Sequence, residues 1–181
     1  MRSGLLALTL LLAAAQPATA RRALPSSPDL GTAEGRCRAD EPGPAILITA
    51  EGLKDRTGTL RAELYPPDDA DFLADDNVLL NAGKTFRRVE TTLPPSGAVH
   101  LCIRAPGPGT YTLSLLHDRD GNRKFGLMTD GIGFPGNPAL HWAKPPASVA
   151  RIAVGPAITR TTIVLNYRHG LLSFGPIGGT R

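Results

Sequence analysis

The sequence has little excess of charge of either sign. Its 20 lysines and arginines face 16 aspartates and glutamates, and the formal net charge is +4 at pH 7. Acidic and basic residues are dispersed along the chain, without the concentrated basic stripe by which proteins bind nucleic acid. We therefore exclude nucleic acid as a partner.

Motifs of nucleophilic and metal-dependent catalysis are also missing. The chain has no Gly-x-Ser-x-Gly elbow and no His-Glu-x-x-His pair, and its histidines are scattered without ligand spacing. We expect a non-enzymatic protein, with an envelope hydrolase that uses His117 and nearby aspartates as the alternative.

Long hydrophobic runs are missing after the first twenty residues. Leu5 to Ala15 form an apolar run between Arg2 and the small-x-small sequence at 18–20. The run is shorter than the roughly 20 residues of a membrane-spanning helix, and this order of features is typical of a secretory signal peptide. We predict that residues 1–20 are a signal peptide, that the protein is periplasmic or secreted, and that no integral membrane segment follows.

Cysteine is scarce: only Cys37 and Cys102 are present. In an oxidising compartment two cysteines indicate a disulfide. Such a bond would close a long loop and contribute about 3–4 kcal/mol on the loop-entropy model. The alternative is a pair of free thiols acting as ligands or as a nucleophile.

Glycine and proline, in contrast, are abundant, with 20 and 17 copies that argue against much helix. They separate short alternating or β-branched segments at 45–53, 58–65, 84–93, 97–105, 109–117, 147–155 and 158–168. This pattern predicts an all-β fold, an antiparallel two-sheet β-sandwich of about seven strands, immunoglobulin-like or transthyretin-like. Residues 68–83 fit either a helix or a long loop.

Alternation within these segments also predicts the core and the domain limits. The residues expected to point inward are Leu60, Leu64, Val99, Leu101, Tyr111, Leu113, Ile152, Val154, Ile163 and Leu165. We assign 21–40 to a flexible N-terminal arm, 41–169 to the sandwich domain and 170–181 to a C-terminal tail.

The segment "HDRDGNRKFG" (117–126) places oxygen-bearing side chains at alternate positions around a glycine. Asp118, Asp120 and Asn122 could converge on a hard cation such as calcium, which binds six to eight oxygens. The spacing is not that of an EF-hand, because the twelfth position from Asp118 is Thr129.

A plain turn explains the same segment equally well. Asp and Asn side chains can hydrogen-bond their own backbone in Asx turns. The interleaved basic residues would repel a dication; they are Arg119, Arg123 and Lys124. Calcium therefore remains the one cofactor that the loop suggests, beside the interpretation as a hairpin turn.

Two aromatic features border this loop. His117 and Asp118 are adjacent on a strand and point to opposite faces, so they do not form a dyad; His117 then hydrogen-bonds the loop. Trp142, with His141 and Phe134, forms either an aromatic platform for a sugar or peptide, or a plug over one end of the sandwich. The partner predicted here is an envelope protein or a glycan.

The stretch "PGPGTYTLSLLHDRDGNRKFG", with "DGIGFPGNP", "KPP" and the closing "ITRTTIVLNY", resembles a family of exported bacterial proteins catalogued as domain of unknown function 2141. The resemblance covers about residues 45–168. The matching positions are His117, Asp118, Gly121, Asn122, Lys124, Gly131, Gly133, Phe134 and Asn137. It implies an exported β-sandwich domain without an established activity.

One position departs from that family's pattern. Many relatives carry Asp or Asn where this chain has Gly126, so a cation site here would be either weakened or completed by Asp130 instead. The predicted metal ligands are therefore Asp118, Asp120, Asn122 and Asp130. The predicted binding residues are His117, Phe134, Asn137 and Trp142.

Overall fold

The computed structural model describes residues 22–38, 40, 43–141, 143–170 and 173–178. The predicted signal peptide and Trp142 lie outside the described residues. No helix among the described residues is long and apolar enough to cross a membrane.

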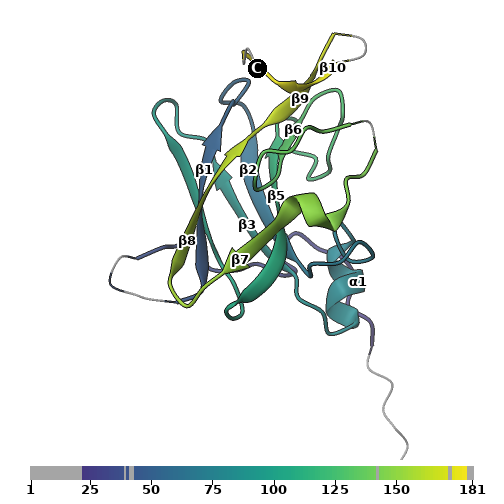
Figure 1. Ribbon diagram of the computed structural model, residues 1–181. Helices are drawn as coiled ribbons and strands as arrows, with labels where there is room; N and C mark the ends of the chain where they lie inside the picture. Colours follow the sequence, from purple (N-terminus) through teal and green to yellow (C-terminus); the bar gives the residue numbers. More distant parts are fainter. Residues whose placement is uncertain (1–21, 39, 41–42, 142, 171–172, 179–181) are drawn as a thin grey trace, which may run out of the picture.

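Two β-sheets make up the body of the protein (Figure 1). The small sheet has the order β4-β1-β8, formed by β1 (Ala45–Glu51), β4 (Val99–Arg104) and β8 (Ile158–Val164). The large sheet has the order β10-β9-β6-β5-β2-β3, with β7 also paired to β5. Its strands are β2 (Thr59–Tyr65), β3 (Arg87–Thr92), β5 (Gly109–Asp118), β6 (Gly131–Gly133), β7 (Arg151–Val154), β9 (Asn166–His169) and β10 (Ser173–Pro176).

The prediction of an all-β sandwich is confirmed, since each predicted segment contains a strand. The short strands β6 and β10 lie outside those segments. One pairing differs from the expected antiparallel arrangement: β1 and β8 run parallel. Residues 155–157 turn the chain from β7 in the large sheet into β8 in the small sheet, so this crossover sets the direction of β8.

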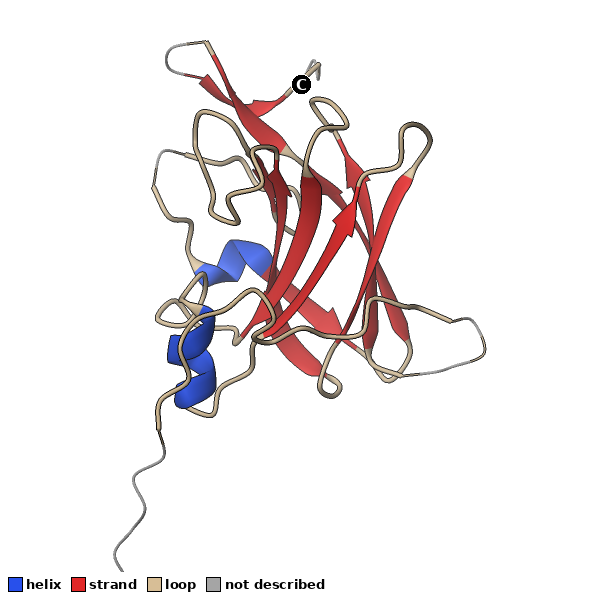
Figure 2. Cartoon of the chain, turned by 180° about the vertical axis from the view of Figure 1, so that it is seen from behind, coloured by secondary structure: helices blue, strands red, loops and turns tan. Residues whose placement is uncertain are grey.

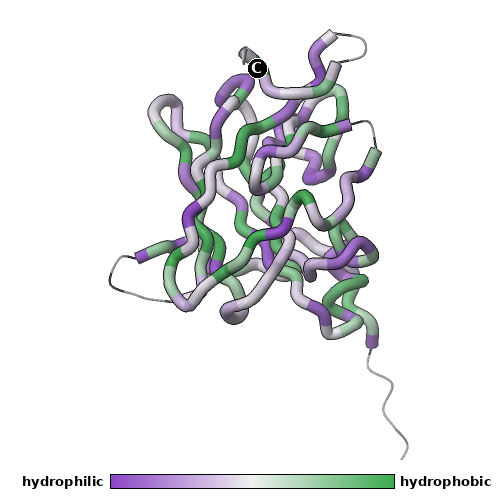
Figure 3. Tube along the Cα trace, in the orientation of Figure 1, coloured by the Kyte–Doolittle hydropathy of each residue, from purple (hydrophilic) through white to green (hydrophobic). Residues whose placement is uncertain are grey.

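The main core lies between the two sheets and follows the predicted alternation. In β2, for example, Leu60, Ala62 and Leu64 are fully buried. All the residues predicted to point inward belong to this core, and Tyr111 alone among them is only partly buried. Tyr111 lies near the start of β5, where its hydroxyl donates to the carbonyl of Gly107 at 2.8 Å. Figure 3 shows the hydrophobic residues distributed along these strands.

A second apolar cluster lies on the other face of the large sheet. It consists of Tyr65, Phe72, Leu79, Phe86, Phe134, Ala147 and Ala150. Two short helices contribute to it, α1 (Asp76–Asn81) and the 3₁₀ helix η1 (Ala147–Ala150). Figure 2 shows both helices on the same side of the strands. The segment 68–83 is thus mostly loop, with one short helix that contributes Leu79 to this cluster.

The disulfide prediction is confirmed. Cys37 is bonded to Cys102 on β4, with their Cα atoms 5.5 Å apart, and the two-thiol alternative is wrong. Other described residues of the N-terminal segment also contact the body: Thr32 forms a bridge with Arg88 of β3, and the backbone of Leu24 hydrogen-bonds the side chain of Asn81.

Candidate functional site

His117 lies at the end of β5 and is fully buried. Its Nε2 atom lies 2.7 Å from the carbonyl oxygen of Thr57, and its Nδ1 atom lies 2.6 Å from the hydroxyl of Tyr167. A carbonyl oxygen only accepts hydrogen bonds, so Nε2 carries the proton of the neutral ring. Nδ1 therefore accepts the hydroxyl proton of Tyr167.

The surroundings stabilise this protonation state. Burial lowers the pKa of His117, and burial also raises the pKa of Tyr167 to about 12. The Tyr167 oxygen accepts a further hydrogen bond from the backbone N–H of Lys54 at 3.2 Å. Both ring nitrogens of His117 are therefore engaged by the protein, and neither is free to remove a proton from a substrate.

The next basic residue along the chain, Arg119, forms an ion pair with Asp55, which lies in the loop before β2. Its Nη2 and Nε atoms donate to Oδ2 of Asp55 at 2.5 and 3.0 Å, and Nη1 donates to the carbonyl of Thr129 at 2.8 Å. The hydrogen bond from Arg119 lowers the pKa of Asp55 to about 2. This ion pair fastens the beginning of the 118–130 loop to the loop before β2.

Two buried aspartates organise the 118–130 loop. Asp118 accepts the backbone N–H groups of Gly121 at 2.9 Å and Arg123 at 2.7 Å. Asp130 accepts those of Arg119 at 2.9 Å and Gly126 at 2.7 Å. Each carboxylate thus closes one half of the loop, and backbone dipoles stabilise its negative charge.

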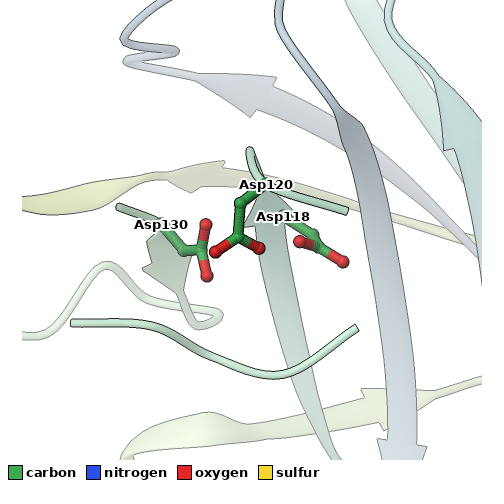
Figure 4. A group of neighbouring side chains, drawn as sticks. All are labelled: Asp118, Asp120 and Asp130. Carbon is green, nitrogen blue, oxygen red and sulfur yellow. The ribbon is translucent and has the colours of Figure 1, made fainter. Parts of the chain in front are cut away.

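The exposed part of the loop contains the predicted Asx turns. Asp120 accepts the N–H of Asn122 at 3.1 Å, and Asn122 accepts that of Lys124 at 2.7 Å. The predicted convergence of acids also occurs, because Asp118, Asp120 and Asp130 offer oxygens within 4.8 Å of one another. Figure 4 shows these three carboxyl groups gathered in one place. The same loop thus combines turn geometry with a cluster of carboxylates that a hard cation could bridge.

The segment after the loop requires glycine at close approaches. A Cβ atom on Gly131 would overlap the ring of Tyr167, and one on Gly133 would overlap the side chain of Ile163. Asn137, with a φ of 49°, bonds the exposed edge of β8 by accepting from the N–H of Val164 at 2.7 Å. The two glycines of the matching Gly-x-Gly sequence therefore allow this segment to lie close against the sandwich, and the matching Asn hydrogen-bonds it to β8.

A cleft of about 380 Å³ opens on the outer face of the large sheet. Its floor is formed by outward-facing residues of β2, β5 and β6, and its rim by segments 73–76 and 123–125. We call this space the polar cleft, because it is lined by Arg61, Glu63, Asp76, Arg88 and Lys124, among other residues.

The charged side chains of the polar cleft form a connected network. Glu63 accepts from Nε of Arg88 at 2.8 Å and from the hydroxyl of Tyr65 at 2.5 Å. Nη1 of Arg88 also donates to Oδ2 of Asp76 at 3.2 Å. Burial, and secondly the charge of Glu63, raise the pKa of Tyr65 well above its usual range, so Tyr65 keeps its proton and donates a hydrogen bond to Glu63. Arg61 donates from Nη2 to the carbonyl of Arg123 at 2.6 Å.

A second space of about 370 Å³ adjoins the polar cleft. We call it the apolar cleft, because most of its lining is hydrophobic: Leu73, Phe125, Leu127, Ile132, Phe134, Leu140, Ala143, Pro145 and Phe174, with His141 and Lys144 beside them. Leu73, Phe125 and Ile132 line both spaces. The two clefts therefore adjoin along a shared boundary.

The predicted binding residues occupy different environments. His117 is buried behind Tyr167, and Asn137 serves the edge of β8. Phe134 is buried in the second apolar cluster, where its ring packs edge-on against Phe72 at 5.6 Å, and it also lines the apolar cleft. Phe134 thus reaches the apolar cleft, and Asn137 lines a smaller hollow beside Val164.

The sequence alone does not indicate that the charged residues of the polar cleft form a site. On β2, Arg61 and Glu63 alternate with buried leucines, which is the pattern of a solvent-facing strand surface. Their burial depends on segments 73–76 and 123–125, which are distant in sequence. The available signal was the pairing of opposite charges on the outward face of a central strand.

Comparison with known proteins supports the resemblance seen in the sequence. A family model described as "Uncharacterized protein conserved in bacteria (DUF2141)" matches residues 48–162, which is more than half of the chain. No curated protein and no solved structure matches the chain.

Proposed function

The chain belongs to this bacterial family, and on that premise we propose that it is an exported, non-enzymatic binding module of the cell envelope. The binding site in this proposal is the pair of adjoining clefts on the outer face of the large sheet. The ligand that we propose for this site is a small molecule. The envelope protein or glycan expected as a partner from the sequence remains a prediction.

The observation that carries the proposal is the polar cleft with the apolar cleft beside it. Each has a volume within the range of about 300–1,000 Å³ that is usual for ligand sites. Apolar walls with a few placed charges are the usual composition of such sites. Strands β2, β5 and β6 form the floor of the polar cleft, Ile132 of β6 and Phe174 of β10 line the apolar cleft, and the 118–130 loop supplies part of the rim.

The hydrolase alternative is less well supported by the same geometry. Both ring nitrogens of His117 are hydrogen-bonded inside the protein, and Asp118 and Asp130 hold the backbone of their loop. A general base must reach the proton that it removes. The residues proposed for catalysis are instead occupied in stabilising the fold.

Binding is tested by nuclear magnetic resonance with a neutral apolar probe, N-phenylnaphthylamine. We expect amide shifts that concentrate at Leu73, Phe125 and Ile132, the residues common to both clefts. Export is tested separately by expressing the full chain in a bacterium and sequencing the N-terminus of the periplasmic product, which should begin at Arg21. Absence of cleft shifts would contradict the binding proposal, and an uncleaved cytoplasmic chain would contradict export.

Calcium binding by the 118–130 loop is a second candidate function. What supports it is the convergence of the oxygens of Asp118, Asp120 and Asp130 within 4.8 Å. Carboxylate oxygens are suitable calcium ligands, and each can accept a metal ion besides a backbone N–H group. A cation bound here would stabilise the rim of the polar cleft rather than take part in chemistry.

A further inference from the structure

We propose that the two adjoining clefts together bind an amphipathic anion, with its acidic head at Arg61 in the polar cleft and its hydrophobic body in the apolar cleft. This inference rests on the proposed binding function and names the chemical class of the ligand. A carboxylate, sulfonate or phosphate carried on an aliphatic or aromatic body of modest size has this chemistry.

The first argument is the incomplete hydrogen bonding of Arg61. Its side chain is 5% exposed, and its Nε atom is buried without a hydrogen-bond partner. Among the described residues, the guanidinium has one hydrogen bond, from Nη2 to the carbonyl of Arg123. Buried polar groups are nearly always hydrogen-bonded. Arg61 lines the polar cleft and no described residue accepts from its Nη1 atom, so the guanidinium has a donor left for an acceptor that enters the cleft.

The nearest carboxylate does not supply that acceptor. Oε1 of Glu63 lies 3.3 Å from Nε of Arg61, but the contact lacks hydrogen-bond geometry. Glu63 already accepts from Arg88 and from Tyr65. Glu63 therefore compensates the charge of Arg61 without accepting a hydrogen bond from it, and an anionic head in the cleft could accept one from the guanidinium.

The other charges around the polar cleft favour an anion overall. Asp76 is engaged by Arg88 and by the backbone of Asn77, at 3.2 and 2.6 Å. Asp75 is the remaining acid of the lining, whereas Lys124 and Arg123 add two exposed cations at the rim. The cations of the lining therefore outnumber the acids.

The second argument is the abrupt change of polarity at the boundary between the clefts. Lys124 lines only the polar cleft, and Phe125, the next residue, lines both. Phe125 is 43% exposed, and its ring packs edge-on against Phe174 at 6.4 Å. An elongated ligand placed across this boundary would cover Phe125 and remove apolar surface from water.

The third argument is backbone strain at the rim. Leu73 and Arg123 have positive φ angles of 58° and 63°, a region that bulky L residues rarely adopt. Both residues line the polar cleft, and Leu73 lines the apolar cleft as well. Strained backbone of this kind persists where the surroundings enforce it and is frequent at ligand sites.

The experiment compares two fluorescent probes that differ by the anionic group, anilinonaphthalene sulfonate and neutral N-phenylnaphthylamine. We expect the folded protein to bind the sulfonate more tightly. Arg61→Met should weaken sulfonate binding about tenfold to a hundredfold, as expected for the loss of a charge-assisted contact, and leave binding of the neutral probe unchanged. Circular dichroism and thermal unfolding establish that the variant is folded.

A second pair of variants avoids the buried network. Lys124→Met removes an exposed cation at the rim, and we expect it to weaken the sulfonate selectively. Arg160→Met on β8, in the small sheet, is the matched charge control. Phe125→Ser should weaken both probes, whereas Val78→Ser, an exposed apolar residue of α1 outside both clefts, should weaken neither.

The outcomes separate the two proposals. Equal binding of both probes, with no effect of Arg61→Met or Lys124→Met, would overturn the anion inference and leave a neutral-ligand module. Failure of both probes to shift the amides of the clefts would overturn the binding function and this inference together. If Arg61→Met does not fold, Lys124→Met with its control decides the question.

Discussion

Nδ1 of His117 lies 2.6 Å from the hydroxyl oxygen of Tyr167, and this contact joins the end of β5 to β9 within the large sheet. Because Nε2 donates to Thr57, the pair has one direction: Tyr167 donates and His117 accepts. The histidine of the matching motif is thus a buried structural connector.

Tyr167→Phe should therefore destabilise the protein. The substitution leaves Nδ1 of His117 and the N–H of Lys54 without their partner, at a cost of about 1–3 kcal/mol. Urea unfolding measures the loss. Tyr111→Phe is the matched control, because its hydroxyl bonds a partly exposed carbonyl and its loss should have the smaller effect; equal losses would contradict the role given to Tyr167.

The pH dependence of stability should also report on His117. Its pKa is lowered in the folded state, mainly by burial, so the unfolded chain takes up a proton first as the pH falls. The stabilisation is complete above about pH 6.5, the unfolded value, and decreases as the pH falls from there through the lower folded pKa. Urea unfolding between pH 8 and pH 5, roughly the range of histidine titration, measures this slope.

His117→Gln is the variant that tests the origin of the slope. Glutamine does not titrate, so the variant should show a flatter pH profile even if it is less stable throughout. An unchanged slope in the variant would assign the effect to other groups.

Strands β2 and β6 show which structural features the sequence predicts and why it does not predict others. Period-two alternation identifies Leu60 and Leu64 as core, because the local pattern and the burial agree. Arg61 has the same local signature as a solvent-facing residue, and only the distant segments 73–76 and 123–125 reveal that it is buried. Strand β6 is hidden for another reason: Gly131 and Gly133 have low strand propensity but are required by the close approach of Tyr167 and Ile163.

The ion pair between Arg119 and Asp55 should matter at acid pH. Its hydrogen bond lowers the folded pKa of Asp55 to about 2, below the unfolded value of 3.8, so its stabilisation is present above pH 3.8 and is lost as the pH falls through about 2. Asp55 is about one-third exposed, which reduces the contribution to on the order of 1 kcal/mol. Asp55→Asn should lower stability by that amount at neutral pH and change little near pH 2.

The control for Asp55 is an ion pair with weaker geometry. Glu90 lies 3.9 Å from Arg123, which is 48% exposed, and exposed pairs contribute about 0–1 kcal/mol. Glu90→Gln should therefore have little effect on urea unfolding at neutral pH. A loss as large as that of Asp55→Asn would mean that the bidentate geometry of Arg119 is not the cause.

Calcium should raise the melting temperature of the protein if the 118–130 loop binds it, because a ligand bound only by the native state stabilises that state. The measurement is thermal unfolding of the chain from residue 21 with EDTA and then with excess calcium. Asp120→Asn should abolish the increase, since Asp120 is the exposed member of the carboxylate cluster and does not hold the buried ends of the loop. Asp29→Asn, a substitution of an exposed aspartate outside the cluster, should preserve it. An identical melting curve with and without calcium would contradict calcium binding. Asp118 and Asp130 would then act only by accepting the backbone N–H groups that hold the loop in its conformation.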